Sequence, residues 1–393
     1  MFSARTGWPL APNRLHTLAQ ARRAAGTLLD LTVSNPTVCG FDYPQAALLS
    51  ALGQAAALRY EPAPLGLAAA RRAVAGYYAE RGVAVALDRL LLTASTSEAY
   101  AHLFRLLCDP GDNVLMPSPS YPLFEMLAGV HDVRLTAVPM MYDQGWQLDL
   151  AGLEAAATPQ TRALLLVHPN NPAGSYLKPH EWARLQTLAA ERGWALVLDE
   201  VFCDYALPPA APVELGLERP PALTFVLNGF SKILALPQMK LAWIGVHGPP
   251  AACAEAMARL EVVNDLFLSV DAPIQYAAAA MLGARGGIQA QIRARLQANL
   301  RALDAVLALL PALRAAERLR VEGGWSVMLR LPRIHTDEAW AELLLERTGV
   351  LTHPGHFYGL AAESHLAFSL LPPAADFAAA AGRLGQAIAA ELG

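Results

Sequence analysis

The chain has 393 residues with a net charge of −4, and 54% of its residues are hydrophobic. This length is too great for one ordinary core, so we expect two lobes or one large domain with additions. No stretch reaches the roughly 18 uncharged apolar residues that a membrane span needs, and no lysine or arginine run marks a nucleic-acid surface. Neither a membrane nor a nucleic acid is therefore expected as a partner.

The first 16 residues interrupt every apolar run with arginine or proline, which predicts no secretory signal and a cytoplasmic location by default. Four cysteines, at positions 39, 108, 203 and 253, lie far apart with no CxxC pair. They predict buried reduced thiols, and neither a disulfide framework nor a metal site.

Short apolar runs alternate with amphipathic stretches from about residue 90 to 247, which is typical of a mostly parallel sheet between helices. One amphipathic stretch, 180–192, places Trp182, Leu185 and Leu188 at helical spacing, which indicates a packed helix. Another helix is expected at 98–107. The seven expected strands are 90–93, 113–116, 133–138, 163–168, 195–199, 224–227 and 241–246.

Beyond residue 246 an alanine- and arginine-rich region, 249–315, predicts helix with a break around 283–287. A compact α+β segment follows. We expect its strands near 326–330, 350–352 and 365–371 and its helices near 337–347 and 375–392. The fold class is thus α/β: a large domain with a mostly parallel seven-stranded sheet, plus a smaller α+β domain.

Chemistry in such a sheet collects at the carboxyl ends of the strands. After the strand that ends at residue 93, Ser95, Thr96 and Ser97 open a helix. Free backbone N–H groups and hydroxyls at a helix start form an anion site, although an ordinary capping box explains the same residues.

Two further strand ends carry polar side chains. Asn171 lies in a loop that two prolines and a glycine make rigid, so its side chain is held in one direction unless the loop is purely structural. Asp199 ends a buried strand, where its charge needs a partner. A protonated heterocyclic nitrogen would serve, and so would an arginine or a helix cap.

Lys232 follows another apolar strand, in NGFSK, and is one of only three lysines in the chain. A lysine at such a junction is desolvated, which lowers its pKa and favours the neutral amine that forms imines. A surface lysine is the alternative, but the neighbouring residues are not those of a surface segment.

Taken in order, HPNNPAG (168–174), ALVLDEVF (195–202) and GFSKILALPQMKLAWIGV (229–246) resemble the class I/II aminotransferases, which are fold-type I pyridoxal 5'-phosphate (PLP) enzymes. The resemblance extends from LTVSNPTV (31–38) to THPGHFYGL (352–360). It implies an enzyme that moves an amino group between an amino acid or amine donor and a keto-acid or carbonyl acceptor. It further implies an N-terminal segment, 1–50, a large PLP-binding domain, 51–275, and a small domain, 276–393.

The same resemblance implies roles for individual residues. Lys232 would hold PLP as an internal imine and would move a proton between the substrate's α-carbon and the cofactor's C4' carbon. The reaction would pass through a pyridoxamine intermediate. Asp199 would pair with the ring nitrogen. Asn171 would bond the phenolic oxygen, and Tyr121 would stack on the ring. The hydroxyls and amides of 95–97 would bind the phosphate. Tyr60 matches a tyrosine that reaches the phosphate of a neighbouring subunit, which implies a homodimer.

Three cofactor-binding positions depart from the family pattern. Lys240 replaces a phosphate-binding arginine, which keeps the charge but loses the bidentate fork. Phe202 replaces a tyrosine that bonds the phenolic oxygen, so Asn171 becomes the main partner of that oxygen. Gly229 stands where the family often has a serine, and Ser231 would take over the phosphate contact of that serine.

The largest departure is Ala367, which stands where the family has an arginine that clamps the substrate's α-carboxylate. Either His365, Arg330 or His356 supplies the missing charge, or the substrate lacks a conventional α-carboxylate. This departure keeps a lyase or decarboxylase reaction open as the alternative to transamination. A PLP-binding regulator would need a basic DNA-binding extension, and a nicotinamide dehydrogenase would need a GxGxxG motif, and neither is present.

Overall fold

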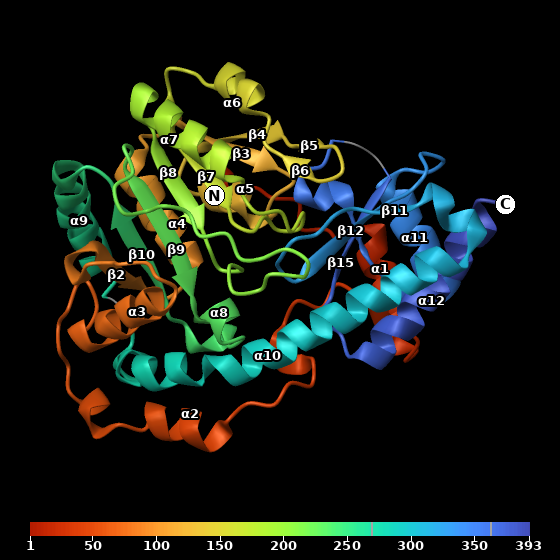
Figure 1. The fold of residues 1–393 in the computed structure, drawn as a ribbon, viewed down its shortest axis with the longest axis horizontal. Helices are drawn as coiled ribbons and strands as arrows, with labels where there is room; N and C mark the ends of the chain where they lie inside the picture. The colour runs from red at the N-terminus through yellow and green to blue at the C-terminus, as the bar shows by residue number, and fades with distance from the viewer. Residues whose placement is uncertain (269, 362–363) are drawn as a thin grey trace.

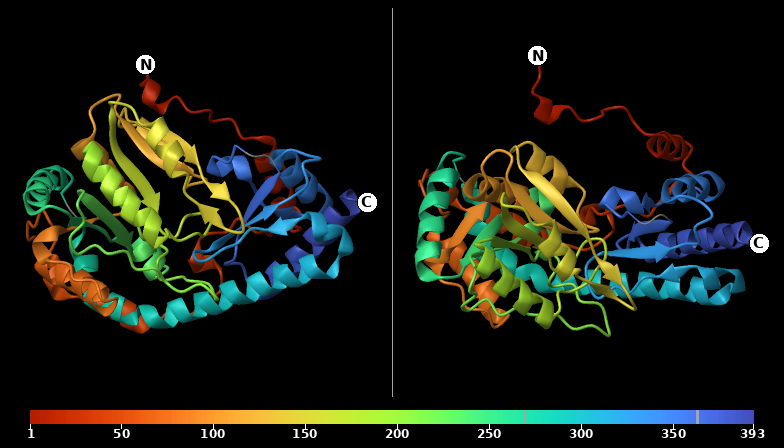
Figure 2. Two further views of the ribbon diagram at one scale, coloured as in Figure 1. Left: turned by 45° about the horizontal axis from the view of Figure 1, so that its top comes forward. Right: turned by 90° about the horizontal axis from the view of Figure 1, so that it is seen from above.

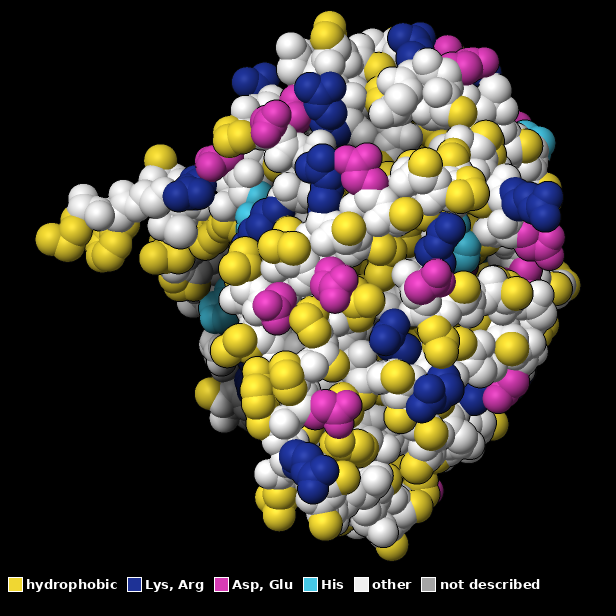
Figure 3. Space-filling model, turned by 90° about the vertical axis from the view of Figure 1, so that its left-hand side faces the viewer, with side chains coloured by type: hydrophobic (Ala, Val, Ile, Leu, Met, Phe, Trp, Pro, Cys, Tyr) yellow, Lys and Arg dark blue, Asp and Glu magenta, His cyan; other side chains and the backbone are white. Residues whose placement is uncertain are grey.

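The computed structural model describes residues 1–268, 270–361 and 364–393 of the chain. The molecule has two lobes, and one long helix, α10, runs along both of them (Figures 1 and 2). Among the described residues, no helix combines the length and the apolar character that crossing a bilayer demands. Positive and negative side chains are interspersed on the face of the large lobe that Figure 3 shows.

The large lobe is built on a seven-stranded sheet in which only β10 runs antiparallel to its neighbours. Every strand residue is buried except Arg162 in β7 and most residues of the edge strand β4, as expected for apolar runs covered on both faces. Each expected strand is present within three residues. In spatial order the strands are β2 (Leu90–Thr93), β10 (Ala242–His247), β9 (Thr224–Gly229), β8 (Ala195–Asp199), β7 (Thr161–Val167), β3 (Asn113–Ser118) and β4 (Arg134–Pro139).

Helices cover both faces of this sheet. One face packs against α4 (Thr96–Leu107), α5 (Leu123–Gly129) and α9 (Pro250–Asp265). The other packs against α6 (Leu150–Ala156) and α7 (Pro179–Arg192), where Trp182, Leu185 and Leu188 are buried as expected. Next to β2 and β10, α3 (Ala68–Glu80) and α2 (Gln45–Leu52) pack against the start of α10 (Ala272–Leu309). The fold class predicted from the sequence is therefore confirmed.

The expected break at 283–287 is wrong, because α10 runs without interruption through Gly283, Gly286 and Gly287. Its buried residues pack against α3 at one end and α12 at the other, and this packing outweighs the intrinsic cost of about 1 kcal/mol per glycine. The actual break lies between α9 and α10, just before Pro273 at the first turn of α10.

The small lobe contains a four-stranded sheet of order β11-β12-β15-β14, packed on α11 and α12. The N-terminal segment joins this lobe, since α1 packs on α11 and β1 pairs with β13. A hairpin, β5 (Met141–Tyr142) and β6 (Trp146–Gln147), reaches toward it from the large lobe. The elements are α1 (Arg14–Ala24), β1 (Leu29–Asp30), β11 (Glu317–Arg318), β12 (Ser326–Arg330), α11 (Asp337–Thr348), β13 (Val350–Leu351), β14 (His353–Pro354), β15 (His365–Ser369) and α12 (Ala374–Glu391).

The glycines inside α10 provide a test of the continuous helix. Gly287 is exposed and a methyl group at its Cβ position would meet no atom within 4 Å. Gly287→Ala should therefore raise the free energy of unfolding by about 0.5–1 kcal/mol, measured by urea titration. Gly385→Ala in α12 is the matched control: its added methyl would clash with Val306, so it should destabilise. A destabilising effect of Gly287→Ala would contradict the continuous helix.

Candidate active site

Three neighbouring strands bring the expected site residues to one edge of the sheet. Ala242, at the start of β10, pairs with Thr93 at the end of β2 and with Gly229 at the end of β9. The residues that follow β2 and β9 and those that precede β10 therefore meet. They are Ser95, Thr96 and Ser97 after β2, Ser231 and Lys232 after β9, and Lys240 before β10.

The start of α4 is capped by side chains and also has free N–H groups that could bind an anion. The Ser95 Oγ accepts from the Glu98 N–H at 3.1 Å, and the Glu98 carboxylate accepts from the Ala94 N–H at 2.5 Å. The two bonds cap the helix, although Glu98 bonds the N–H of Ala94 and not that of the N-cap Ser95, so the strict capping box is not formed. This cap leaves the N–H groups of Thr96 and Ser97 without partners in the helix, so they remain available to an anion.

Asp199 is a buried acid at the end of β8, with 5% of the residue exposed. Its Oδ2 accepts from the Tyr100 Oη at 2.7 Å and its Oδ1 from the Val201 N–H at 3.0 Å. Burial nevertheless raises its pKa, and these two bonds and the Lys232 charge only partly oppose the shift. A protonated ring nitrogen beside this carboxylate would restore the ionised form, so the residue fits the pyridine of PLP.

Lys232 lies in the short helix α8 (Phe230–Ile233), with its Nζ 5.3 Å from the ring centroid of Phe202 and 5.0 Å from that of Trp325. Burial among these rings lowers its pKa to about 8, although the Asp199 carboxylate raises it. The Tyr205 Oη donates to the Lys232 carbonyl at 2.6 Å and holds the backbone in place. The backbone that carries the amine is therefore fixed, and the amine loses its proton at a lower pH than an exposed lysine does.

Asn171 and Tyr121 approach the same region from β7 and β3. The Asn171 Oδ1 accepts from the Ser326 Oγ at 3.3 Å, and among the described residues its amide NH2 makes no hydrogen bond, so it can donate to a ligand. Tyr121 is 37% exposed and packs edge-on against Phe124. Burial and the nearby charge of Asp199 raise the pKa of Tyr121, which places it close to that carboxylate.

Trp325 was missed by the sequence analysis, because no motif precedes it and only the tertiary fold brings it to Lys232. It is buried against Phe202 and Tyr205. Its indole N–H has no hydrogen-bond partner among the described residues. This buried donor is therefore available to a bound group.

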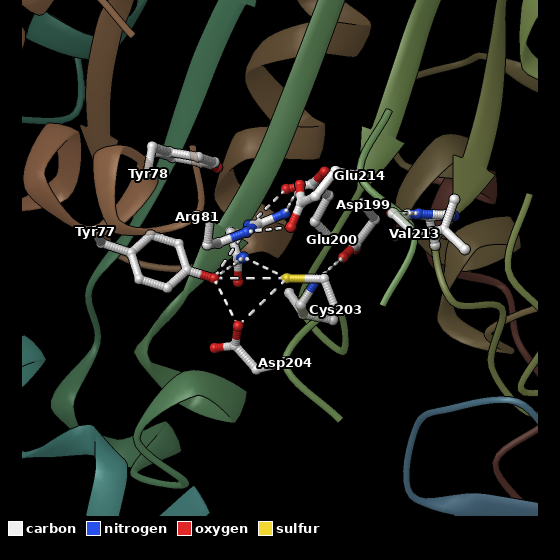
Figure 4. A network of polar contacts seen from close by, with 12 residues as sticks. Tyr77, Tyr78, Arg81, Asp199, Glu200, Cys203, Asp204, Val213 and Glu214 are labelled. Carbon is white, nitrogen blue, oxygen red and sulfur yellow. Dashed lines mark hydrogen bonds and ion pairs between the residues drawn. The ribbon is translucent and has the colours of Figure 1, made fainter. Parts of the chain in front are cut away.

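A buried polar network lies directly behind Asp199 (Figure 4). Arg81, with 12% of its side chain exposed, contacts Glu200 at 3.1 Å and Glu214 at 2.8 Å. It also donates to the Tyr77 Oη at 3.1 Å, and that hydroxyl donates to Asp204 at 3.2 Å. The sequence analysis did not find this network, because its members are scattered between residues 77 and 214.

One expected ligand, Tyr60, lies apart from this cluster within one chain, whereas Lys240 is at its rim. Tyr60 is 81% exposed and lines a cavity of about 200 Å³ with Asp271 and Tyr276. Among the described residues, no contact joins it to Lys232 of its own subunit. Lys240 is exposed at the edge itself, in a left-handed backbone conformation (φ 49°).

The three cations suggested in place of the missing arginine are engaged or remote. Arg330 forms an ion pair with Glu317 on the neighbouring strand. His356 contacts Asp337 through its backbone N–H at 2.6 Å and its Nδ1 at 3.1 Å. His365 is buried on β15, two residues before Ala367. At Gly229, an added Cβ would approach Ala242 at 2.8 Å and the Leu241 carbonyl at 2.9 Å, so a serine does not fit there.

A buried acid opposite a desolvated lysine, at the edge of a seven-stranded α/β sheet, defines the class of PLP-dependent enzymes with this fold. Residues 29–384 match the family model described as aminotransferase class I and II. The chain therefore belongs to the aminotransferase class I and II family and is a PLP-dependent aminotransferase.

Related proteins carry the same function in their names. The chain is 28% identical to an alanine aminotransferase of Mycobacterium tuberculosis over 388 residues, which cover 95% of this chain and 88% of that protein. It is 29% identical to an arginine–pyruvate transaminase of Pseudomonas aeruginosa over 385 residues, with 96% and 95% covered.

Among solved structures, an alanine aminotransferase from Pyrococcus furiosus superposes with a TM-score of 0.87 at 21% identity, covering 99% of both chains. A double mutant of the Thermus thermophilus aspartate aminotransferase gives a TM-score of 0.83 at 25% identity, covering 98% of this chain and 99% of that one. None of these relatives favours the lyase or decarboxylase alternative.

The lowered pKa of Lys232 predicts how its amine reacts with the aldehyde of added PLP in the cofactor-free protein. A pKa of about 8 means that the neutral amine increases as the pH rises through that value. The capture rate, followed by stopped-flow absorption, should rise about tenfold per pH unit below the pKa and level off above it. Asp199→Asn removes the charge that raises this pKa, so the midpoint should move to lower pH. A midpoint near 10.5 would contradict the desolvated site.

Proposed function

We propose that Lys232 is the residue that binds PLP covalently and that the residues at the sheet edge assemble around it. The observation that supports this proposal is the environment of the Lys232 amine. This amine is surrounded by the rings of Phe202 and Trp325, has its pKa lowered to about 8, and lies near the buried Asp199 carboxylate. A lysine so placed is a ready nucleophile for a carbonyl group.

The ring of the cofactor would be held from three sides. Asp199 would pair with the protonated ring nitrogen, Asn171 would donate its free amide to the phenolic oxygen, and Tyr121 would stack on the face. PLP bound in this way supplies an electron sink for the negative charge that develops on the substrate's α-carbon. Because Phe202 offers no hydroxyl, Asn171 has to hold the phenolic oxygen without it.

The phosphate group would lie at the start of α4. The free N–H groups of Thr96 and Ser97 and the positive end of the helix dipole favour a dianion there. The Ser95 and Ser231 hydroxyls add donors. Lys240 adds a positive charge from the loop before β10, which meets the same edge.

Lys232 would also carry the proton of the reaction. Its Nζ would take the proton from the α-carbon of the amino donor and return it at the cofactor carbon that receives the nitrogen. A group that alternates as base and acid works best with a pKa near the working pH. The burial that lowers the Lys232 pKa to about 8 brings it into that range.

The attachment site is tested by covalent trapping. After reduction of the holoenzyme with borohydride, peptide mapping should find the cofactor permanently attached to Lys232 as a label. Lys232→Ala should carry no such label and should lose activity by at least about 10³-fold. Lys178→Ala is the matched control, because Lys178 pairs with Glu322 at 2.5 Å and should not affect labelling. A labelled Lys232→Ala protein would overturn the assignment.

We further propose a homodimer in which Tyr60 completes the partner's phosphate site. Supporting this, Tyr60 is exposed and separate from the cluster of its own chain. Mixing Tyr60→Ala with Lys232→Ala protein should then restore activity to about a quarter of wild type, since half of the dimers would contain one intact site. If Tyr60 serves its own subunit, the mixture stays as inactive as the two variants alone.

A further inference from the structure

One face of the small-lobe sheet, formed by side chains of β12, β14 and β15, is turned toward the active site. Ala367 of β15 pairs with Met328 of β12 on one side and with His353 of β14 on the other, so these side chains share a face. The opposite face belongs to the core of the small lobe, where the buried side chains are Val327, Leu329, Leu366 and Phe368.

This face is turned toward the cofactor cluster. Ser326, on the same face of β12, donates to Asn171. Ala367 and Met328 form an apolar cluster with Ala173, two residues beyond Asn171. Ala367 and its neighbours are therefore opposite the loop that we expect to hold the cofactor's phenolic oxygen.

His353 and Tyr358 form a hydrogen-bonded pair beside Ala367. The His353 Nδ1 lies 2.9 Å from the Tyr358 Oη, and both residues are partly exposed. Burial raises the pKa of Tyr358 to about 12, and the nearby Tyr121 adds to the shift, so the phenol keeps its proton and donates to Nδ1. The imidazole then carries its own hydrogen on Nε2 and presents a neutral donor.

Charges around this pair disfavour an anion. Burial lowers the pKa of His353, so the ring is neutral near pH 7, and the nearest charge acting on it is the carboxylate of Asp30. Among the described residues of β12, β14 and β15, this face contains one arginine, Arg330, which Glu317 neutralises, no lysine, and the buried His365. A substrate carboxylate beside Ala367 would be desolvated without a free arginine or lysine, which is unfavourable.

A further donor belongs to the same cluster. Trp146 of the β5–β6 hairpin is buried with Ala367, and its indole N–H has no partner among the described residues. The cluster thus combines neutral donors with an apolar wall, a combination that suits a carbonyl or hydroxyl oxygen.

We propose that His353 and Tyr358 are specificity-determining residues that bind an uncharged oxygen-bearing group next to the amino-bearing carbon of the donor, with Ala367 as the apolar wall. The preferred donors are then amino amides or amino alcohols, and α-amino carboxylates are poorer. This inference rests on transamination at Lys232 and names its substrate class.

The test uses holoenzyme and three matched donors: L-alanine, L-alaninamide and L-alaninol. Loss of the visible cofactor band without acceptor gives kcat/KM for each donor, corrected for the fraction of unprotonated amine. We expect the amide or the alcohol to exceed alanine by about tenfold or more. His353→Leu and Tyr358→Phe should each reduce the ratio of kcat/KM for the uncharged donor to that for alanine by about tenfold, which is the typical cost of an unpaired polar group. The loss should affect the uncharged donor and leave kcat/KM for alanine unchanged.

Two further variants separate specificity from stability. Ala367→Arg introduces a carboxylate-binding charge and should reverse the preference toward alanine. His356→Gln is the matched histidine control, because His356 faces Asp337, and it should leave the ratio unchanged. Wild type favouring alanine by tenfold, or an equal loss for all donors in His353→Leu, overturns the inference. A band that no donor removes overturns transamination itself.

Discussion

The site depends on the desolvation of one carboxylate, Asp199, at the end of a central strand. A buried charge of this kind is unfavourable unless donors and a cation compensate it. Tyr100 and the Val201 N–H provide two donors, and Lys232 provides positive charge only when it is protonated. The cofactor-free protein thus contains an incompletely compensated acid, and a protonated ring nitrogen beside it would stabilise both partners.

Rigid surroundings maintain this arrangement. Behind Asp199, the adjacent Glu200 is neutralised by Arg81, which prevents a second uncompensated carboxylate at the same strand end. From α10, Gln289 donates to Asp204 at 2.7 Å and to the carbonyl of Ile233 at 3.0 Å. Because Ile233 follows Lys232, the helix that joins the two lobes is bonded to the segment that carries the reactive amine.

The proposed substrate-binding residues are separated in space from those proposed to hold the cofactor. The residues that would hold the cofactor come from the large lobe, whereas Ala367 and His353 come from the small-lobe sheet. A change in donor preference can therefore arise on β14 and β15 without disturbing Asp199 or Lys232. Arg330 is paired with Glu317 and His356 contacts Asp337, so both side chains that could bring positive charge to Ala367 are already engaged.

The sequence predicted the strands of the large sheet in their order along the chain, the helices between them, and the strand ends that carry Asn171, Asp199 and Lys232, but not the spatial order of the strands. Apolar periodicity and short motifs are local signals, and they are sufficient for these features. It did not determine the continuity of α10, where packing on α3 and α12 outweighed the local preference of three glycines. Nor did it reveal Tyr100, Trp325 or the pair of His353 and Tyr358. Their roles depend on neighbours far away in the chain, and only the tertiary structure brings those neighbours within bonding distance.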